Sequence, residues 1–492
     1  MIGSGMGAMA AAARLAVAGH RVTVFERSAT YGGAVGSVRR EGFAFDTGPG
    51  LLHLPAVWRD LFVKTGKEPL EQCVDLVQVD PASRHLFADG TDVTLPNASR
   101  AGIVSALEGA LGAGAGERWG GFLGRAREAW DRSRRPLLEE PLRSDWHPLE
   151  RDPYPAVRQR RLLRSRQAGT VAEVGAWELG DPRLAALFDA YALSYGLDPR
   201  SAPASAALLP YMEQTFGSWY VTGGLRELAR AVYERCVARR VEFVFGAEVN
   251  AIVERDDRAA GVALADGTVV EADWVVAGIG NVRSLTTSPL WHDGEVSAQT
   301  SADLVQPGRF TVLLALRGAR PSTAHRTVVH SLDPEAEAEA VFGGRAADHP
   351  TVTVLRPDDP LTRPDAEHEA ITVSATVAGQ GGQLDWSDKA LRERYAELLL
   401  DAAGRATGGV RELRERLLWH EVLTPVETGV LTPPALAGGR GRWLHPGNST
   451  RLPGLLLVGG HAHPGGGLAH AGMSGALVAG LIVEGADFRG SQ

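Results

Sequence analysis

Near the start of the chain, three small residues have the spacing of a dinucleotide-binding turn. Gly3, Gly5 and Ala8 form the pattern G-x-G-x-x-A, and helix-forming residues follow them directly. The apolar stretch 21–25 reads as a buried strand, and Glu26 comes next, 21 residues after Gly5. Glycines let a pyrophosphate approach the backbone at a helix N-terminus, and a carboxylate at the strand end can bind an adenosine ribose. The pattern therefore predicts a site for an adenine dinucleotide.

The strand that should precede this turn is short. Only Met1 and Ile2 stand before Gly3, whereas strands usually have about five residues. We expect either a very short first strand or a natural start a few apolar residues earlier.

A second strand–turn–helix unit closes the chain. Residues 455–458 read as a buried strand, Gly459 and Gly460 end it, and 468–483 read as a helix of small and apolar residues. A helix N-terminus after a glycine turn suits a polar or anionic cofactor.

Three histidines, His461, His463 and His470, are concentrated in this closing segment. Imidazole titrates near neutral pH, so one of them could act as an acid or base beside a cofactor. We take His470 and His463 as candidate catalytic residues, with a purely structural role as the alternative. The isolated His53 and His85 are predicted to be structural.

Composition excludes several classes of protein. The 492 residues predict two or three structural units, and 44% hydrophobic with 22% charged residues excludes disorder for most of the chain. A net charge of −8 does not favour a nucleic-acid binder. Two cysteines, Cys73 and Cys236, cannot form a disulfide framework, a cysteine-rich zinc site or a CxxC pair, and no metal site is predicted. The low cysteine content fits a reducing cytoplasm, where we expect the protein, and no apolar run is long enough to span a membrane.

The sequence resembles the phytoene desaturase-like flavoproteins within the amine oxidase superfamily. The resemblance depends on a Gly-Gly turn after Glu26, on the stretch GFAFDTGPG at 42–50, and on the closing turn with its His-Pro-Gly run at 463–465. The matching residues of the first two segments are Gly32, Gly33, Phe43, Phe45, Asp46, Gly48 and Pro49. The family usually has Arg after the Gly pair, where this chain has Ala34; Arg27 or Arg39 could replace that charge.

This resemblance implies bound FAD. Carried over to this chain, the cofactor-binding residues are Gly3, Gly5, Met6, Gly7, Ala8, Glu26, Arg27, Gly32, Gly33, Ala34, Gly48, Pro49, Gly50, Val249, Gly459, Gly460, Gly467 and Leu468. In relatives the segment that matches Val249 lies against the adenine.

The expected fold class is α/β, a discontinuous Rossmann-like FAD-binding domain with an inserted α+β substrate domain. The FAD-binding domain is predicted at 1–96, 216–282 and 441–492. The substrate domain is predicted at 97–215, mostly helical, and at 283–440, a sheet with helices.

The resemblance implies desaturation of a hydrophobic, polyene-like carotenoid or isoprenoid by hydride transfer to the flavin. The protein should then supply an apolar tunnel rather than a triad or a metal. Two alternatives stay open: a dehydrogenase or isomerase of the same family acting on an unsaturated, aromatising polyketide-type chain, and a non-catalytic flavin-binding protein. Amine oxidation is disfavoured, because few aromatic residues follow Tyr395.

Residues 158–166 contain five arginines and are predicted as a basic helix, with Trp130, Trp146 and Tyr154 nearby. Such a helix is a solvated face, a contact for the anionic inner face of the membrane, or a contact for an acidic carrier protein. The oligomeric state is left open.

Overall fold

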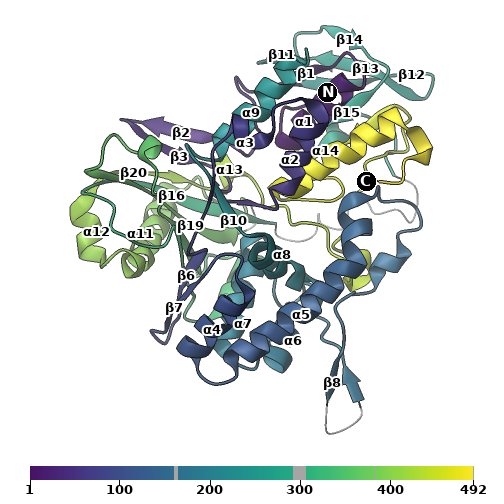
Figure 1. The fold of residues 1–492 in the computed structure, drawn as a ribbon. Helices are drawn as coiled ribbons and strands as arrows, with labels where there is room; N and C mark the ends of the chain where they lie inside the picture. Colours follow the sequence, from purple (N-terminus) through teal and green to yellow (C-terminus); the bar gives the residue numbers. More distant parts are fainter. Residues whose placement is uncertain (160–163, 292–305, 382, 491–492) are drawn as a thin grey trace.

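The computed structural model describes residues 1–159, 164–291, 306–381 and 383–490. The first and last helices, α1 and α14, lie side by side on one half of the molecule, and a large sheet with a helical group forms the other half (Figure 1). The predicted α/β class with a discontinuous cofactor domain is confirmed.

A parallel sheet contains both ends of the chain. Its strands, in order, are β11 (Glu242–Phe245), β1 (Thr23–Glu26), the residues around Ile2, β15 (Val275–Ala277) and β21 (Leu455–Leu457). Ile2 pairs with Phe25 on one side and with Ala277 on the other. The first strand is therefore very short and lies at the centre of the sheet.

Helices α1 (Met6–Val17) and α14 (Leu468–Val483) touch backbone to backbone. A Cβ added at Gly475 would lie 2.6 Å from the carbonyl oxygen of Gly7, and a Cβ added at Gly7 would lie 2.9 Å from the carbonyl oxygen of Ala471. Any side chain at these positions would separate the helices, so glycine is required for the close approach.

Smaller elements surround the parallel sheet. They are α2 (Ala56–Thr65), α3 (Leu70–Cys73), α9 (Leu225–Ala238), the hairpin β2 (Ser37–Arg40) with β3 (Phe43–Asp46), the sheet β4 (Leu52–His53), β10 (Ser218–Val221) and β5 (Leu76–Gln78), and the sheet β12 (Val249–Arg255), β13 (Arg258–Leu264) and β14 (Val269–Glu271). Strands β13 and β14 form an antiparallel hairpin.

The second half of the molecule is built on a seven-stranded mixed sheet. Its order is β20 (Leu417–Leu423), β16 (Pro307–Arg317), β19 (His368–Ala378), β18 (Val352–Leu355), β17 (Arg326–Val329), β6 (Ser83–Leu86) and β7 (Asp92–Leu95). Strands β6 and β7 lie in the range 1–96 that the sequence assigned to the cofactor domain, but they extend this sheet through the parallel β17–β6 pair. The predicted boundary at residue 96 is therefore too late for this hairpin, because its pairing partner is more than 200 residues away.

Helices cover the large sheet on both sides. They are α10 (Pro334–Phe342), α11 (Lys389–Ala406), α12 (Val410–Arg416) and α13 (Pro425–Thr428), and the helical group α4 (Arg100–Leu111), α5 (Ala115–Arg134), α6 (Val171–Val174), α7 (Pro182–Ser194) and α8 (Leu208–Phe216). The mostly helical character predicted for 97–215 agrees with α4 to α8, and the helices predicted beside the sheet at 283–440 agree with α10 to α13.

The basic helix predicted at 158–166 is wrong, because the flanking residues form an antiparallel hairpin, β8 (Val157–Gln159) with β9 (Arg164–Arg166). This hairpin projects from the helical group (Figure 1). Trp130 and Tyr154 are buried and cannot act as surface anchors, whereas Trp146 is partly exposed.

Asp359 joins the two halves of the molecule. This carboxylate is buried after β18, accepts a hydrogen bond from the Tyr220 hydroxyl at 2.8 Å, and accepts another from the backbone N–H of Gly223 at 2.6 Å. It belongs to the Pro-Asp-Asp-Pro stretch at 357–360, which the sequence analysis placed in the substrate domain.

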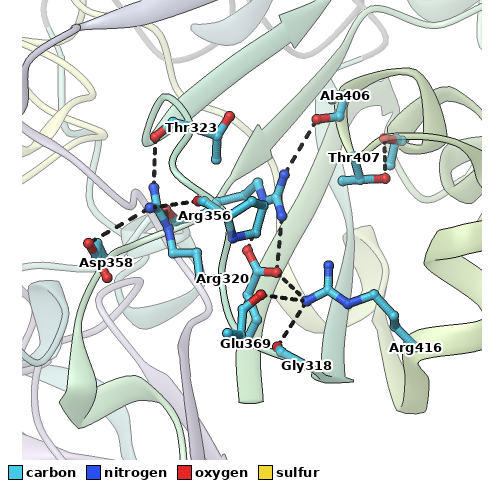
Figure 2. A network of polar contacts seen from close by, with 12 residues as sticks. Gly318, Arg320, Thr323, Arg356, Asp358, Glu369, Ala406, Thr407 and Arg416 are labelled. Atoms are coloured by element: carbon cyan, nitrogen blue, oxygen red, sulfur yellow. Dashed lines mark hydrogen bonds and ion pairs between the residues drawn. The ribbon is translucent and has the colours of Figure 1, made fainter. Parts of the chain in front are cut away.

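A buried ion-pair network precedes Asp359 (Figure 2). Arg356 donates to the two carboxylate oxygens of Glu369 at 2.8 and 3.0 Å, and both side chains are almost fully buried. Arg416 donates to the same carboxylate at 2.8 Å, and Arg320 donates to the carbonyl of Arg356 at 3.0 Å. The network therefore fixes the end of β18 against the rest of the sheet.

Replacing Arg356 by Met should lower the free energy of unfolding by about 3 kcal/mol, because Glu369 loses its bidentate partner in a buried site. Chemical unfolding of the purified protein measures this. The double variant Arg356→Met/Glu369→Leu should recover part of the loss, and Arg411→Met, in an exposed pair with Glu415, should change little. Equal losses for Arg356→Met and Arg411→Met would contradict this account.

Candidate functional site

The turn before α1 provides a cradle for a phosphate group. Gly5 is the N-cap of α1, and a Cβ placed on it would find no atom within 4 Å. The first N–H groups of an α-helix have no partner within the helix, and they face this open space. Residues Gly5 to Ala8 thus fit the pyrophosphate of a dinucleotide.

Glu26 lies at the carboxyl end of β1 beside this turn. Its carboxylate accepts hydrogen bonds from the backbone N–H and the hydroxyl of Ser4 at 2.8 and 2.9 Å, and from the same groups of Ser28 at 2.9 and 2.8 Å. Burial alone would raise the pKa of Glu26, but these hydrogen bonds outweigh it and hold the pKa below its usual value. An ionised acceptor at this strand end suits a ribose.

The Gly-Gly turn lies directly on the fingerprint turn. Gly32 forms a parallel bridge with Gly5, and a Cβ on Gly33 would lie 3.1 Å from Cα of Gly5. Ala34 follows, and its carbonyl oxygen contacts Gly48. The predicted cofactor residues from three separate segments are therefore brought together.

Arg226 is the cation that holds this turn, and the sequence analysis missed it. Its guanidinium donates to the carbonyl oxygens of Tyr31 at 2.5 Å and Val35 at 3.1 Å. Arg39, proposed as a replacement for the family arginine, instead lies 3.6 Å from the carboxylate of Glu227. Arg27, the other proposed replacement, is exposed.

Asp46 supports the same region. It accepts hydrogen bonds from the backbone N–H groups of Leu225 at 2.8 Å and Arg226 at 3.2 Å, at the start of α9. Burial raises the pKa of Asp46 to about 6, against the effect of these two bonds. Asp46 therefore fixes α9 to the strand that leads into the Gly48–Gly50 loop.

The closing turn completes the cradle. Gly459 has a φ of +93°, which favours glycine, and a Cβ there would find open space. Its N–H donates to the Ser474 hydroxyl at 2.9 Å, which fixes the turn to α14. Gly467 is the N-cap of that helix and Leu468 its first residue. Of the other predicted residues, Val249 is packed in the core between the parallel sheet and β12–β14.

A cavity of about 220 Å³ lies at the carboxyl ends of β15 and β21, with Asn281, Arg283 and His461 in its lining. Ligands of open parallel sheets bind beyond the carboxyl ends of the strands. The residues that line this cavity come from the segments around 277–291 and 446–462, and none of the predicted cofactor-binding residues is among them.

The two candidate catalytic histidines are buried and neutral. His463 is fully buried, its Nε2 lies 3.0 Å from the carbonyl oxygen of Glu140, and burial lowers its pKa to about 3. Burial, with His445 nearby, lowers the pKa of His470 to about 4. Since an imidazole of such low basicity is a poor proton acceptor, His463 serves mainly to attach the closing motif to the helical group.

A buried polar cluster joins the substrate half to the cofactor half. Arg326 forms two hydrogen bonds with Glu213, and Nε2 of His53 lies 3.5 Å from the same carboxylate. Tyr191 donates to Glu213 at 3.2 Å. The prediction that His53 is an isolated structural residue missed this cluster, because its members come from β4, α7, α8 and β17.

Comparison with known proteins assigns the chain to a family. The sequence profile described as flavin containing amine oxidoreductase matches residues 9–483. The chain belongs to this family. The resemblance predicted from the sequence is thereby confirmed, together with FAD as the cofactor and an oxidoreductase as the class of enzyme.

Several relatives of this flavin-dependent oxidoreductase match it over nearly their full length. A 4,4'-diapolycopene oxygenase from Methylomonas sp is 29% identical over 98% of this chain and 97% of its own. A neurosporene-forming phytoene desaturase from Cereibacter sphaeroides is 27% identical over 95% and 91%. A hydroxyneurosporene desaturase from Rubrivivax gelatinosus is 29% identical over 97% and 92%.

Solved structures show the same fold at lower identity. An oxidoreductase from Methanosarcina mazei superposes with a TM-score of 0.64 at 17% identity, over 97% of this chain and 98% of its own. A putrescine oxidase bound to putrescine superposes with a TM-score of 0.58 at 13% identity, over 98% of both chains.

Replacing Gly5 by Val should abolish FAD retention, because the valine side chain would fill the phosphate cradle. The fold should survive, because no protein atom lies within 4 Å of the new Cβ. The measurement is the ratio of flavin to protein absorbance after purification. Gly109→Val, on the exposed face of α4 with no atom within 4 Å, is the matched control and should keep its flavin. Normal flavin content in Gly5→Val would refute the cradle.

The low pKa of His470 should make stability depend on pH. Its ordinary pKa is 6.5, so the unfolded chain binds a proton at higher pH than the folded protein does. The contribution of neutral His470 is therefore complete above about pH 6.5 and declines toward about pH 4. In thermal unfolding of the flavin-loaded protein, the midpoint should fall less over this range for His470→Gln than for the natural protein. Parallel curves would contradict the burial of a neutral imidazole.

Proposed function

We propose that this oxidoreductase desaturates a hydrophobic polyene, a carotenoid or another isoprenoid chain. The observation that carries the proposal is similarity over 95% and 97% of this chain to two enzymes named as phytoene and hydroxyneurosporene desaturases. Bound FAD supplies the hydride acceptor, because no amino-acid side chain can accept a hydride.

The residues of this chain bind and orient the reactants. The fingerprint turn suits the diphosphate of an ADP group and Glu26 suits its ribose, and Asp46 with Arg226 holds the loops around them. A small cavity separates the Gly48–Gly50 loop from the large sheet, with Tyr220 and His325 in its lining. The volume of this cavity is about 40 Å³, which holds only a few atoms. We therefore place one end of the substrate here, between the cofactor turns and the sheet.

A second candidate reaction is oxygenation of the same class of chain. It is favoured by the 29% identity to a 4,4'-diapolycopene oxygenase over 98% of this chain. The two reactions differ in their products, since only oxygenation adds an oxygen atom to the polyene.

A membrane surface or an acidic carrier protein is the proposed source of the substrate. No helix within the described ranges has the length and apolar character needed to cross a bilayer. The sequence from 158 to 166 has five arginines, and its flanking strands form the projecting β8–β9 hairpin. A basic projection of this kind is attracted to anionic lipids or to an acidic protein, which supports a peripheral place at the inner face of the membrane, in the cytoplasm.

Anaerobic titration of the purified flavoprotein with a partly saturated polyene tests the proposal. The flavin absorbance should bleach while the polyene absorbance shifts to longer wavelength as conjugation grows, and mass spectrometry should show loss of hydrogen. Flavin-free Gly5→Val protein is the control and should produce neither change. A yellow protein that no polyene bleaches would instead be a non-catalytic flavin-binding protein.

A further inference from the structure

The two faces of the large sheet differ in chemistry. On the face that packs against α11, the cross-strand row Val312, Val373 and Val354 is completely buried and apolar. On the other face the neighbouring row is Thr311, Ser374 and Thr353. Side chains alternate between the two faces of a strand, so both rows are fixed by the same register.

Four hydroxyl side chains gather on this second face. Thr372 lies in the adjacent cross-strand row, where it pairs with Leu355. It faces the same side of the sheet as Thr311, Thr353 and Ser374. We call Thr311, Thr353, Thr372 and Ser374 the hydroxyl floor. Strands β16, β19 and β18 are interior strands, yet Thr353, Thr372 and Ser374 are only partly buried. These three hydroxyls are therefore not completely covered by protein, whereas Thr311 is.

One member of the floor borders the cavity proposed for the substrate. Thr372 and Leu355 line the cavity whose opposite wall contains Gly48 and Gly50. Thr311, deeper on the floor, is 2% exposed, and its hydroxyl oxygen has no hydrogen-bond partner within the described part of the chain. A buried polar group without a partner is costly, so a ligand that supplies the partner gains affinity.

A cation stands at one end of the floor. Arg309 lies two residues before Thr311 on the same face of β16, opposite Thr376. Its guanidinium donates to the carbonyl oxygen of Ser194 at 3.2 Å, and among the described residues it forms no ion pair with a carboxylate. Arg326, at the other end, is already neutralised by Glu213. The free charge of Arg309 thus favours an oxygen acceptor, and most of all an anion.

We infer that the polyene bound by this enzyme carries an oxygen acceptor, a hydroxyl or a carboxylate, which lies on the hydroxyl floor with Arg309 beside it. The inference rests on the proposed function and narrows its substrate class. A site built to hydrogen-bond a substrate oxygen rejects the analogue that lacks it, because the buried hydroxyls then stay unpaired. An unsubstituted hydrocarbon should be the poorer ligand.

The test uses the flavin-loaded protein and three linear polyenes of equal length whose one end is methyl, hydroxymethyl or carboxylate. Quenching of tryptophan fluorescence gives each Kd. The natural protein should bind the two oxygen-bearing polyenes about tenfold more tightly than the hydrocarbon. Thr311→Val/Ser374→Ala should lose this preference for both, and Arg309→Met should lose it mainly for the carboxylate.

Thr327→Val is the matched control. Its hydroxyl is also buried without a partner in the described residues, but it lies on the face toward α11, opposite Val354. It should bind all three polyenes as the natural protein does. Flavin content and the unfolding midpoint of each variant confirm that it is folded and loaded.

Three outcomes would overturn the inference. Equal affinity of the natural protein for the three polyenes would contradict the inference of an oxygen-bearing substrate, but it would not contradict polyene desaturation. Loss of flavin, rather than of end-group preference, in Thr311→Val/Ser374→Ala would show that the floor contacts the cofactor. Failure to bind any polyene would remove the proposed function together with the inference.

Discussion

The backbone contact between α1 and α14 is the constraint on which the rest of the structure depends. These helices begin more than 450 residues apart, yet Gly7 and Gly475 bring them within van der Waals distance. Since α1 follows directly from Gly5 and Gly7 lies against Gly459, this contact also brings the fingerprint turn and the closing turn together. Every segment inserted between them must leave the parallel sheet and return to it, which explains why the cofactor half of the molecule is discontinuous in sequence.

Buried polar contacts, together with the apolar packing of Phe43 and Phe45 against Leu313, set the position of the large sheet relative to this cradle. Asp359 binds Tyr220 and Gly223, and Glu213 binds Arg326 beside His53. Such contacts are directional, and separating a buried charge from its partner is costly. They therefore define one distance and one orientation between the Gly48–Gly50 loop and the sheet, which an enzyme needs if a substrate is to meet a cofactor in a fixed geometry.

Local patterns in the sequence were enough to predict the cofactor-binding turns. The glycine spacing, Glu26 and the closing helix each lie within a few dozen residues. The groups around them were not predictable in this way. Arg226 and Glu213 act on partners far away in sequence, and β6 pairs with a strand more than 200 residues later. The stretch 158–166 was read as a helix from its composition, but strand pairing decides between helix and hairpin. Long-range contacts leave no local signal.

The large sheet has an apolar row of side chains on one face and a row of hydroxyl side chains on the other. A hydroxyl within an apolar strand is therefore a candidate for a functional residue. The segment 310–316 reads as a uniformly buried strand, and a single threonine within it attracts no notice in sequence. Only the cross-strand register reveals that Thr311 meets Ser374 and Thr353 on one face. A polyene is a chain of similar units, so apolar contacts alone do not decide which bond stands beside the cofactor. A polar end group bound at a fixed place on the sheet would decide which bond of the polyene lies beside the cofactor, because the chain could then bind in one position only.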